Sequence, residues 1–351
     1  MNRSFWRNKR VLLTGHTGFK GSWLSLWLSF RGAHVTGYAL EPPCRPALYR
    51  LAKIDQDVDS IEADIRNYDS IAAAVNKADP DIVLHLAAQS LVRESYLHPL
   101  ETFATNVMGT ANLLEALRNS DRAKAIVIVT SDKCYENQEW SWGYRENEAV
   151  GGVDPYSASK GCTELVAASF RRSYFNDKHS AGIASARAGN VIGGGDYAAD
   201  RLMTDVMEAI LQGKPARIRN RNAIRPWQHV LEPLHGYLLL AEALAQKGQR
   251  YAEAWNFGPV DEDVKPVSWI CDELVKRWGT SASWTDDGGE HPHEATYLKL
   301  DSSKARARLG WKSKLRLTEA LDRIVDWNRV ATSNGDVRSH TLAEIESYEA
   351  L

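Results

Sequence analysis

Short runs of hydrophobic residues alternate, along the first half of the chain, with longer stretches in which apolar side chains recur every three or four positions. The short runs are rich in β-branched residues and predict strands, and the longer stretches predict helices. We expect strands at 10–14, 34–40, 58–63, 81–86, 125–130 and 182–188, and helices at 21–30, 70–78, 100–118 and 156–175. Because parallel strands need crossover connections, this alternation predicts an α/β fold with a doubly wound parallel sheet.

The pattern changes after residue 190. Three consecutive glycines at 193–195 predict a loop, and the helices expected beyond it alternate with short strands and proline-rich turns; they are 204–211, 234–245, 268–278 and 318–327. We therefore expect a first domain over 1–189, joined by parts of 222–260, and a smaller α/β lobe formed mainly by 190–351. The polar C-terminal end predicts a short helix of no evident role.

Composition narrows the class of protein. The chain has 351 residues, of which 44% are hydrophobic and 25% charged, with a formal net charge of −2. These values exclude long disorder and a broad nucleic-acid-binding surface. No apolar run reaches the roughly 18 residues of a membrane helix. The four cysteines are scattered without CxxC spacing, so we expect reduced thiols, no metal site and a cytoplasmic location.

A glycine-rich turn connects the first predicted strand to the first predicted helix. Gly15, Gly18 and Gly21 recur at a spacing of three, GxxGxxG. Glycine permits a tight turn there and lets backbone N–H groups approach a pyrophosphate at a helix N-terminus. The context favours a Rossmann-type dinucleotide site over a plain strand-to-helix turn. The residues expected to contact the dinucleotide within this turn are Gly15, His16, Thr17, Gly18, Phe19, Lys20 and Gly21.

The end of the second strand decides between NAD and NADP. An acid there would bind the adenosine ribose, and the nearest acid is Glu41, twenty residues past Gly21. The strand end carries no arginine for a 2′-phosphate, although Arg45 is near. The sequence therefore favours NAD. Asp64, which follows the third strand, either contacts the adenine or caps a turn.

Tyr156 and Lys160 form the second chemical signal. Residues four apart share one face of a helix, so the two side chains project together. A neighbouring ammonium favours the phenolate and lowers the pKa of a tyrosine, which is ordinarily about 10. The pair could then remove the proton of a substrate hydroxyl while hydride leaves the same carbon. A surface pair of no function is the alternative when the motif stands alone.

Taken together, these motifs resemble the extended short-chain dehydrogenases/reductases over nearly the full chain. Further motifs in the order of that family are Asp64-Ile65-Arg66, Leu86-Ala87-Ala88-Gln89, Asn106 to Thr110 and Thr130-Ser131-Asp132. The resemblance implies cofactor contacts at Asp64, Ile65, Leu86, Ala87, Ala88, Gln89, Asn106, Tyr156 and Lys160. It also implies that Ser131, or alternatively Thr130, bonds the reacting sugar oxygen, and that Asn106 helps to hold the lysine.

Within that family the chain resembles the sugar-nucleotide 4,6-dehydratases. These enzymes carry an acid pair after the hydroxyl residue, whereas this chain has Ser131-Asp132-Lys133. The resemblance implies that Asp132 is the general acid and CDP-glucose the substrate. The reaction it implies is oxidation at C4, loss of water across C5 and C6, and return of hydride to C6. Lys133 either removes the C5 proton, if it is neutral, or only pairs with Asp132 or contacts NAD.

Several polar residues are candidates for the sugar nucleotide. The resemblance places Ser90 and Asn190 near the sugar and diphosphate, and Arg225 on the pyrophosphate. Arginine suits that role because a guanidinium binds phosphate oxygens bidentately. Arg187 is a further candidate and Arg219 a weaker one, while Trp227 or Tyr297 could stack on the base; any of them could instead be surface or core residues.

Two other readings stay open, and so does the oligomeric state. An epimerase would need Tyr156 and Lys160 but no acid at Asp132, and an NAD(P)-sensing regulator would need none of the three. The resemblance implies a homodimer or a dimer of dimers, built on the helices at 100–118 and 156–175.

Overall fold

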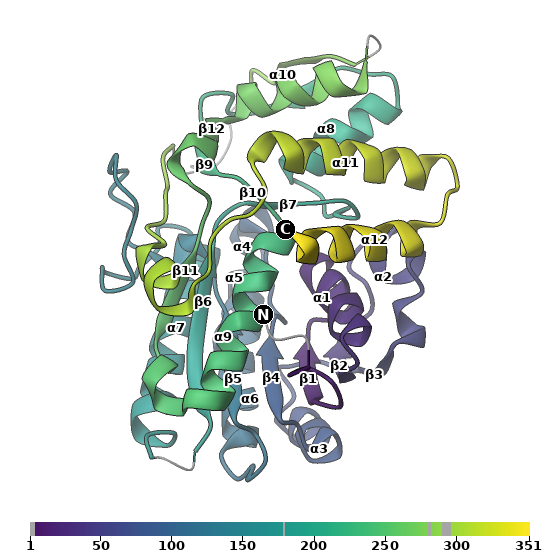
Figure 1. Ribbon diagram of the computed structural model, residues 1–351. Coiled ribbons are helices and arrows are strands. Elements are labelled where there is room, and N and C mark those ends of the chain that lie inside the picture. Colours follow the sequence, from purple (N-terminus) through teal and green to yellow (C-terminus); the bar gives the residue numbers. More distant parts are fainter. Residues whose placement is uncertain (1–3, 178–179, 280–281, 290–295) are drawn as a thin grey trace.

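Seven parallel strands form one sheet at the centre of the molecule (Figure 1). The computed structural model describes residues 4–177, 180–279, 282–289 and 296–351. The strand order is β3-β2-β1-β4-β5-β6-β11, and every neighbouring pair is parallel. The strands are β1 (Arg10–Thr14), β2 (His34–Ala39), β3 (Val58–Glu62), β4 (Ile82–His85), β5 (Ala125–Val129), β6 (Gly182–Ala188) and β11 (Ala254–Phe257). The predicted doubly wound α/β fold is confirmed.

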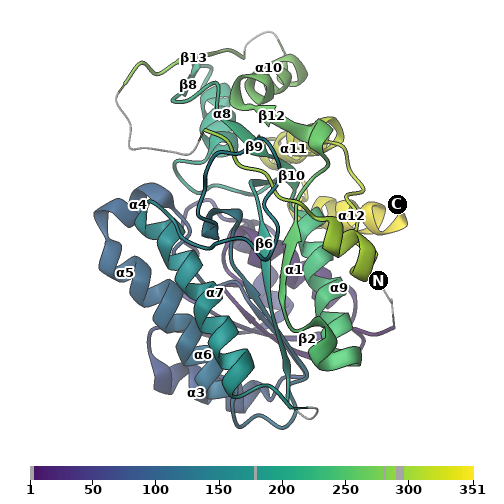
Figure 2. The same ribbon diagram turned by 90° about the vertical axis from the view of Figure 1, so that its left-hand side faces the viewer.

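The central strands are apolar because helices cover both faces of the sheet. β4 and β5 are buried along their whole length, as expected for strands with no solvent-facing side. One face packs against α3 (Tyr68–Ala78), α6 (Gly109–Leu117) and α7 (Pro155–Ser173). The other packs against α1 (Phe19–Phe30) and α9 (Leu231–Lys247). Figure 2 shows the two helical layers on opposite sides of the strands.

The long helix predicted over 100–118 is divided into three segments. They are α5 (Pro99–Phe103), a π-helical turn η2 (Ala104–Met108) and α6. A short helix, α4 (Val92–Leu97), precedes them. π-turns inside helices are frequent at functional sites because they redirect one side chain, and Asn106 lies within this one.

A smaller lobe stands above the carboxyl ends of the strands (Figure 1). Its own core joins α8 (Leu202–Leu211), α10 (Val267–Trp278) and α11 (Leu317–Thr332). Three short strand pairs lie in and below it: β7 (Val191–Ile192) with β10 (Gln228–His229), β8 (Ala216–Ile218) with β13 (Trp284–Asp286), and β9 (Ile224–Pro226) with β12 (Val264–Pro266). The remaining short helices are α2 (Leu48–Leu51), η1 (Ile54–Gln56), η3 (Asp132–Cys134), η4 (Gly248–Tyr251), η5 (Asp261–Asp263) and η6 (Ala305–Leu309).

The C-terminal helix α12 (Val337–Ala350) packs against α1 and not within the lobe core. Tyr348 is fully buried and meets the Trp27 ring edge-on at 5.7 Å. The sequence predicts only a short helix of no evident role here. Its packing shows that the last helix covers the outer side of the glycine-turn helix.

None of the helices in the described part of the chain combines the length and the apolar character needed to cross a membrane.

Candidate active site

The glycine turn brings β1 and α1 into close backbone contact. Gly15 has φ of +76°, a conformation that favours glycine, and its N–H donates to the Tyr38 carbonyl at 2.8 Å. A Cβ on Gly21 would lie 2.1 Å from the Gly15 carbonyl oxygen, so only glycine fits there. The turn therefore leaves backbone at the N-terminus of α1 unobstructed by side chains, which suits a pyrophosphate.

His16 points away from this turn and into the sheet. Its ring is fully buried and its Nε2 lies 2.8 Å from the Ser60 hydroxyl. A Cβ at Gly37 would be 2.5 Å from that ring, so His16 occupies the space beside the second strand. The His16 side chain is therefore directed away from the turn, and the predicted contact of His16 with a cofactor falls to its backbone.

The other residues of the turn have separate surroundings. Thr17 donates its hydroxyl to the Leu40 carbonyl at 2.9 Å, and Phe19 packs below Gly193 of the lobe. Lys20 is half-buried and faces the catalytic groups: burial lowers the pKa of Lys20 to about 7, with Arg201 and Lys160 lowering it further and Asp132 opposing them. Lys20 therefore adds charge to the catalytic side of the cleft.

The neighbouring strand ends complete the cofactor side. Thr14 accepts hydrogen bonds from the backbone N–H groups of Leu86 and Ala87 at 3.2 and 3.1 Å, and it lies 2.7 Å from the ring nitrogen of His85. His85 is thus a packed, hydrogen-bonded residue. Asp64 is held by Arg66, which lowers the pKa of the Asp64 carboxyl. This is the turn-capping alternative for Asp64.

Asn106 fixes the segment after β4 to α7. Its side chain accepts a hydrogen bond from the Gln89 N–H at 2.9 Å, and donates to the Gln89 carbonyl at 3.0 Å and the Ser159 hydroxyl at 2.8 Å. Asn106 is therefore tied to the residue that precedes Lys160. The expected link from Asn106 to Lys160, which runs through water, stays a prediction.

Ser131, Asp132 and Lys133 follow β5 in a single tight turn. The Ser131 hydroxyl donates to Asp132 Oδ1 at 3.0 Å, and Lys133 Nζ lies 3.7 Å from the same oxygen. Asp132 is 1% exposed, and its Oδ2 has no hydrogen-bond partner within the described residues. A buried carboxylate oxygen without a donor is rare and is suited to a polar group of a ligand.

Tyr156 and Lys160 lie on α7, which begins with Pro155 after the N-cap Asp154. Lys160 donates to the Val129 carbonyl at 3.4 Å. Burial lowers the pKa of Lys160 to about 8, while Cys134 and Glu164 raise it. Burial raises the pKa of Tyr156 to about 12, although a hydrogen bond with Ser131 lowers it. The expected lowering of the tyrosine pKa is not found, because the desolvation of the phenol outweighs the hydrogen bond with Ser131 and the charge of Arg201.

The lobe supplies a second set of polar groups. Asn190 Oδ1 is buried and has no hydrogen-bond partner in the described parts of the chain. Arg225 is 6% exposed and lies on β9. Arg219 pairs with Asp200 at 3.1 Å. Arg201 pairs with Asp196 at 3.0 Å and donates to the Ser90 hydroxyl at 3.1 Å, which places Ser90 opposite the lobe.

One sequence-based assignment, Arg187, needs correction, and one open alternative, Trp227, is decided. Arg187 binds Glu164 through Nε and Nη2, both at 2.9 Å, and donates from Nη1 to the Glu146 carbonyl. Its guanidinium is therefore occupied by the protein, which contradicts a role in diphosphate binding. Trp227 is 3% exposed and donates from Nε1 to the Lys265 carbonyl, so it belongs to the lobe core and does not offer a face to a base.

The sequence analysis misses three residues of this region. Arg201 follows the loop of three glycines, and its cationic side chain near the N-terminus of α8 is the signal that could have found it. Tyr237 on α9 has a fully buried hydroxyl that interacts electrostatically with Tyr156 and Asp132. Glu164 lies one helical turn after Lys160 and pairs with Arg187.

Comparison with known proteins assigns the chain to a family. Residues 12–324 match a family model described as GDP-mannose 4,6 dehydratase. The chain belongs to the GDP-mannose 4,6-dehydratase family. This confirms the resemblance to sugar-nucleotide dehydratases within the short-chain dehydrogenases/reductases.

Members of this family and its fold neighbours match most of the chain. The chain is 52% identical over 352 residues to the CDP-glucose 4,6-dehydratase of Salmonella typhimurium, covering 99% of this chain and 98% of that protein. It is 26% identical to the dTDP-glucose 4,6-dehydratase of Haemophilus influenzae, with 76% and 81% covered.

Among solved structures, the Thermotoga maritima UDP-glucose 4-epimerase with UDP-glucose superposes with a TM-score of 0.78 at 22% identity, covering 92% of this chain and 99% of that one. The Thermus thermophilus UDP-glucose 4-epimerase with NAD gives 0.79 at 23%, again over 92% and 99%. These structures show the fold.

Proposed function

We propose that the chain is a hydro-lyase that converts CDP-glucose to CDP-4-keto-6-deoxyglucose. The observation that carries this proposal is the meeting of two pairs at the carboxyl end of β5. Tyr156 and Lys160 are the pair for oxidation, and Ser131 and Asp132 are the pair for elimination. The nucleoside assignment is supported by the relative that is 52% identical and is named as acting on CDP-glucose.

NAD is the cofactor that we propose. The shape of the glycine turn supports it, because Gly15, Gly18 and Gly21 carry no Cβ that would block a pyrophosphate at the N-terminus of α1. Fold neighbours solved with NAD include a Bacillus cereus UDP-glucuronic acid 4-epimerase with a TM-score of 0.78. When bound, NAD would accept hydride from C4, return it to C6 and place a positive charge beside the Tyr156 phenol.

The oxidation step uses groups that are already aligned. Tyr156 takes the proton of the C4 hydroxyl, and Ser131 hydrogen-bonds the same sugar oxygen. Lys160 stabilises the phenolate, because a cation close to the phenol favours its charged form. Neutral Tyr156 is the resting state of the chain alone, since its pKa is about 12; the bound cofactor and substrate must therefore complete the site before the proton leaves.

The elimination step falls to Asp132. Its unpartnered Oδ2 is the oxygen available to protonate the leaving C6 hydroxyl, while Oδ1 is held by Ser131. A base must remove the C5 proton that the new 4-keto group has made acidic. Lys133 is the candidate for this base. Its distance of 3.7 Å from Asp132 fits this role and fits equally the alternative, in which Lys133 only pairs with Asp132.

The lobe holds the nucleotide diphosphate in this proposal. Arg201, Arg219 and Arg225 are the cations that we assign to it, with Asn190 and Ser90 on the sugar. Arg201 and Arg219 are each paired with an aspartate, and a diphosphate would compete for those guanidinium groups with shorter, charge-assisted bonds.

The assay for this function follows the mass of the substrate. The chain is incubated with CDP-glucose and a catalytic amount of NAD, and we expect the loss of one water without net NADH. An epimer of unchanged mass would indicate an epimerase, and no reaction with CDP-, UDP- or dTDP-glucose would favour a sensor. The product would serve as a precursor of deoxysugars of the O-antigen type in lipopolysaccharide.

We further infer a homodimer, or a dimer of dimers, in the cytoplasm. Apolar side chains are exposed on α4, α5, η2 and α7: Leu97 is 71% exposed, Leu100 85%, Met108 56% and Leu165 61%. These helices form one outer layer in Figure 2, and a second copy would cover them as a four-helix interface. Light scattering of a Leu100→Glu variant, expected to be monomeric, tests the interface. The cysteines are free thiols, as expected in a reducing compartment.

A further inference from the structure

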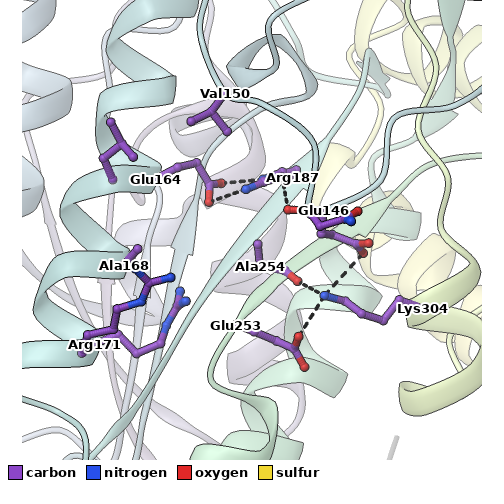
Figure 3. Close-up of a pocket in the computed structure, with 12 residues that line it drawn as sticks. Glu146, Val150, Glu164, Ala168, Arg171, Arg187, Glu253, Ala254 and Lys304 are labelled. Carbon is purple, nitrogen blue, oxygen red and sulfur yellow. Dashed lines mark hydrogen bonds and ion pairs between the residues drawn. The ribbon is translucent and has the colours of Figure 1, made fainter.

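Glu164 is a buried carboxylate directly behind the catalytic residues. It lies on α7 four residues after Lys160, so it extends the face that carries Tyr156 and Lys160. Oε1 accepts from the Thr130 hydroxyl at 2.5 Å and Oε2 from the Ser185 hydroxyl at 2.6 Å. Arg187 adds one bond to each oxygen at 2.9 Å, as Figure 3 shows. The carboxylate is therefore fully hydrogen-bonded.

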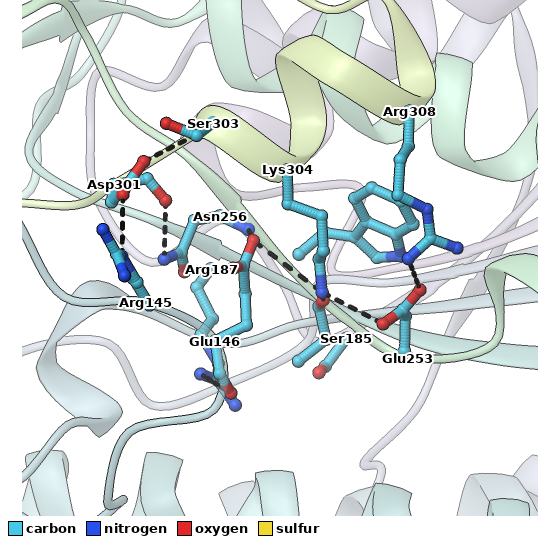
Figure 4. A network of polar contacts seen from close by, with 12 residues as sticks. Arg145, Glu146, Ser185, Arg187, Glu253, Asn256, Asp301, Ser303, Lys304 and Arg308 are labelled. Atoms are coloured by element: carbon cyan, nitrogen blue, oxygen red, sulfur yellow. Dashed lines mark hydrogen bonds and ion pairs between the residues drawn. The ribbon is translucent and has the colours of Figure 1, made fainter.

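Arg187 is fixed as firmly on its other side. Its guanidinium lies 4.7 Å from the centre of the Tyr135 ring, and Tyr135 donates its hydroxyl to Asn256 at 2.8 Å. The neighbouring Glu146 carboxylate accepts from the Asn256 N–H at 2.9 Å and lies 3.9 Å from Lys304 Nζ. Figure 4 shows Arg187 beside this network. Arg187 cannot turn toward a substrate without breaking these contacts.

The connections of this ion pair end at catalytic residues. Thr130, which bonds Glu164, directly precedes Ser131. Tyr135 lies two positions after Lys133. The pair thus joins three elements: the helix with Tyr156 and Lys160, the end of β5 with Ser131, and β6. A side chain that fixes the relative positions of these elements controls the distance between the oxidation pair and the elimination pair.

We propose that Glu164 and Arg187 act together as a positioning pair for the active site, in which Glu164 supplies a fixed negative charge to Lys160 and Arg187 balances it. This rests on the proposed dehydratase function and deepens it by adding two positioning residues to the same site. It also gives Arg187 a role in place of the diphosphate contact that the sequence predicts.

The charges of the pair determine the direction of the effect. Burial alone would raise the pKa of Glu164, but Arg187 and the hydroxyl donors hold it below its ordinary value, so the group is a carboxylate at neutral pH. Glu164 in turn raises the pKa of Lys160 against the lowering caused by burial. Neutralising Glu164 therefore lowers the pKa of Lys160. Removing Arg187 lowers it too, because a buried carboxylate that has lost its cation takes up a proton.

Other charges face the titrating groups and stay unchanged in the test. Those that act on Lys160 or Tyr156 are Cys134 after β5, Lys20 on α1, His85 on β4, Asp132, Asp154 and Arg201. The pair itself also faces Arg171 on α7 and, in the cavity of about 270 Å³ that it borders, Glu253 and Lys304. A shift that has the same direction in the Glu164 and Arg187 variants and does not add up in the double variant therefore reports on the pair.

The experiment compares the pH profiles of kcat for wild type, Glu164→Gln, Arg187→Met and the double variant, with CDP-glucose and NAD. We expect Glu164→Gln to reduce kcat by about 10- to 100-fold with little change in KM. Its profile should move to lower pH by about one unit, and that of Arg187→Met should move in the same direction, because Glu164 takes up a proton once its cation is removed. The double variant should match the profile of Glu164→Gln, with kcat still low.

Each other outcome has a separate meaning. A raised KM for CDP-glucose in Arg187→Met, with an unchanged profile, would overturn the proposal and restore Arg187 to substrate binding. Loss of thermal stability with unmoved profiles would overturn it in favour of a structural role. Glu164→Asp, which keeps the charge, should keep the wild-type profile, and it serves if the glutamine variant does not fold.

A readout without turnover separates this proposal from the proposed function. Lys160 is titrated by NMR in isotope-labelled, reductively methylated protein. Its signal is assigned as the one that is missing in the Lys160→Arg variant. If wild type does not convert CDP-glucose, the dehydratase proposal fails, yet a lowered Lys160 pKa in both single variants would still support the pair. Unshifted titration would overturn the pair whether or not the chain is active.

Discussion

The two sides of the active site hold their polar groups in different ways. On the β5–α7 side, Glu164 has a donor for every lone pair that it offers and is almost inaccessible, and Asn106 bonds two separate segments. On the lobe side, the arginines pair with aspartates and keep part of their side chains accessible: that of Arg201 is 30% exposed and that of Arg219 is 22% exposed. The first side is fixed before substrate arrives, and the second holds ion pairs that a ligand can replace.

This difference matches the two tasks of the site. Groups that move protons must be held in place, because small displacements strongly reduce the rate. Groups that bind a diphosphate need charge and reach, and a phosphate can replace the carboxylate partner of an arginine because it offers the same charge-assisted bonds. Substitutions on the two sides should therefore affect different kinetic constants.

The largest effect is expected from the tyrosine on the fixed side. Tyr156→Phe removes the group that takes the C4 proton and should lower kcat by about 10²- to 10⁴-fold, measured as the rate of water loss. Tyr237→Phe is the matched control, because its buried hydroxyl has no hydrogen-bond partner among the described residues. An equal loss of kcat in the control would contradict the assignment of Tyr156.

The lysine beside Asp132 tests the elimination half of the same side. Lys133→Met should abolish exchange of the C5 proton with deuterated water if Lys133 is the base, and kcat should fall with it. Exchange is followed by mass spectrometry of the bound and released sugar nucleotide. Full exchange in the variant would remove Lys133 as the base and leave it the role of pairing with Asp132.

A smaller effect is expected on the lobe side. Arg201→Met should raise KM for CDP-glucose about 10- to 100-fold, since a hydrogen bond to a charged group contributes about 1.5 to 3 kcal/mol, with kcat nearly unchanged. Arg217→Met is the control, because Arg217 is 75% exposed and pairs with Asp287. A drop in kcat without a change in KM would place Arg201 among the fixed groups and blur the distinction.

The smallest effect concerns stability and compares two buried carboxyls. Glu164 forms an ion pair with Arg187. Within the described parts of the chain, Glu232 accepts hydrogen bonds only from Tyr348 and two backbone N–H groups. Burial raises the pKa of Glu232 to about 7, from an ordinary 4.5. Its stabilising contribution is therefore complete below about pH 4.5 and is lost as pH rises to about 7.

The Glu232→Gln variant checks this sign. Between pH 5 and pH 8 the free energy of unfolding, measured by urea denaturation, should decrease in both proteins. The decrease should be smaller in the variant than in wild type by about 2 kcal/mol. Equal pH dependence of the two proteins would show that Glu232 is ionised throughout.

Much of the fixed side could be predicted from the sequence, because its residues lie on regular elements. Gly15, Gly21, Tyr156 and Lys160 follow spacings that a turn or a helix converts directly into geometry. Arg187 was assigned wrongly because its position on a buried strand does not reveal that Glu164, on a helix, lies opposite. That pairing depends on how α7 packs across the sheet.

The lobe was less predictable for a physical reason. Arg201 follows a loop of glycines and aspartates whose path depends on tertiary contacts, such as the bond from Trp23 Nε1 to the Gly194 carbonyl at 3.0 Å. Trp227 follows Arg225 by two positions, just after β9 ends, and its ring is drawn into the core by the bond from Nε1 to the Lys265 carbonyl. Local patterns cannot predict that bond.

The most direct test of the account follows one hydrogen atom through the reaction. CDP-glucose labelled with deuterium at C4 is incubated with the chain and catalytic NAD, and the product is analysed by mass spectrometry and NMR. If one site oxidises, eliminates and reduces without releasing its intermediates, water is lost and the deuterium appears at C6 of the product. Water loss with deuterium missing from C6, or an epimer that keeps all its oxygen atoms, would contradict the account.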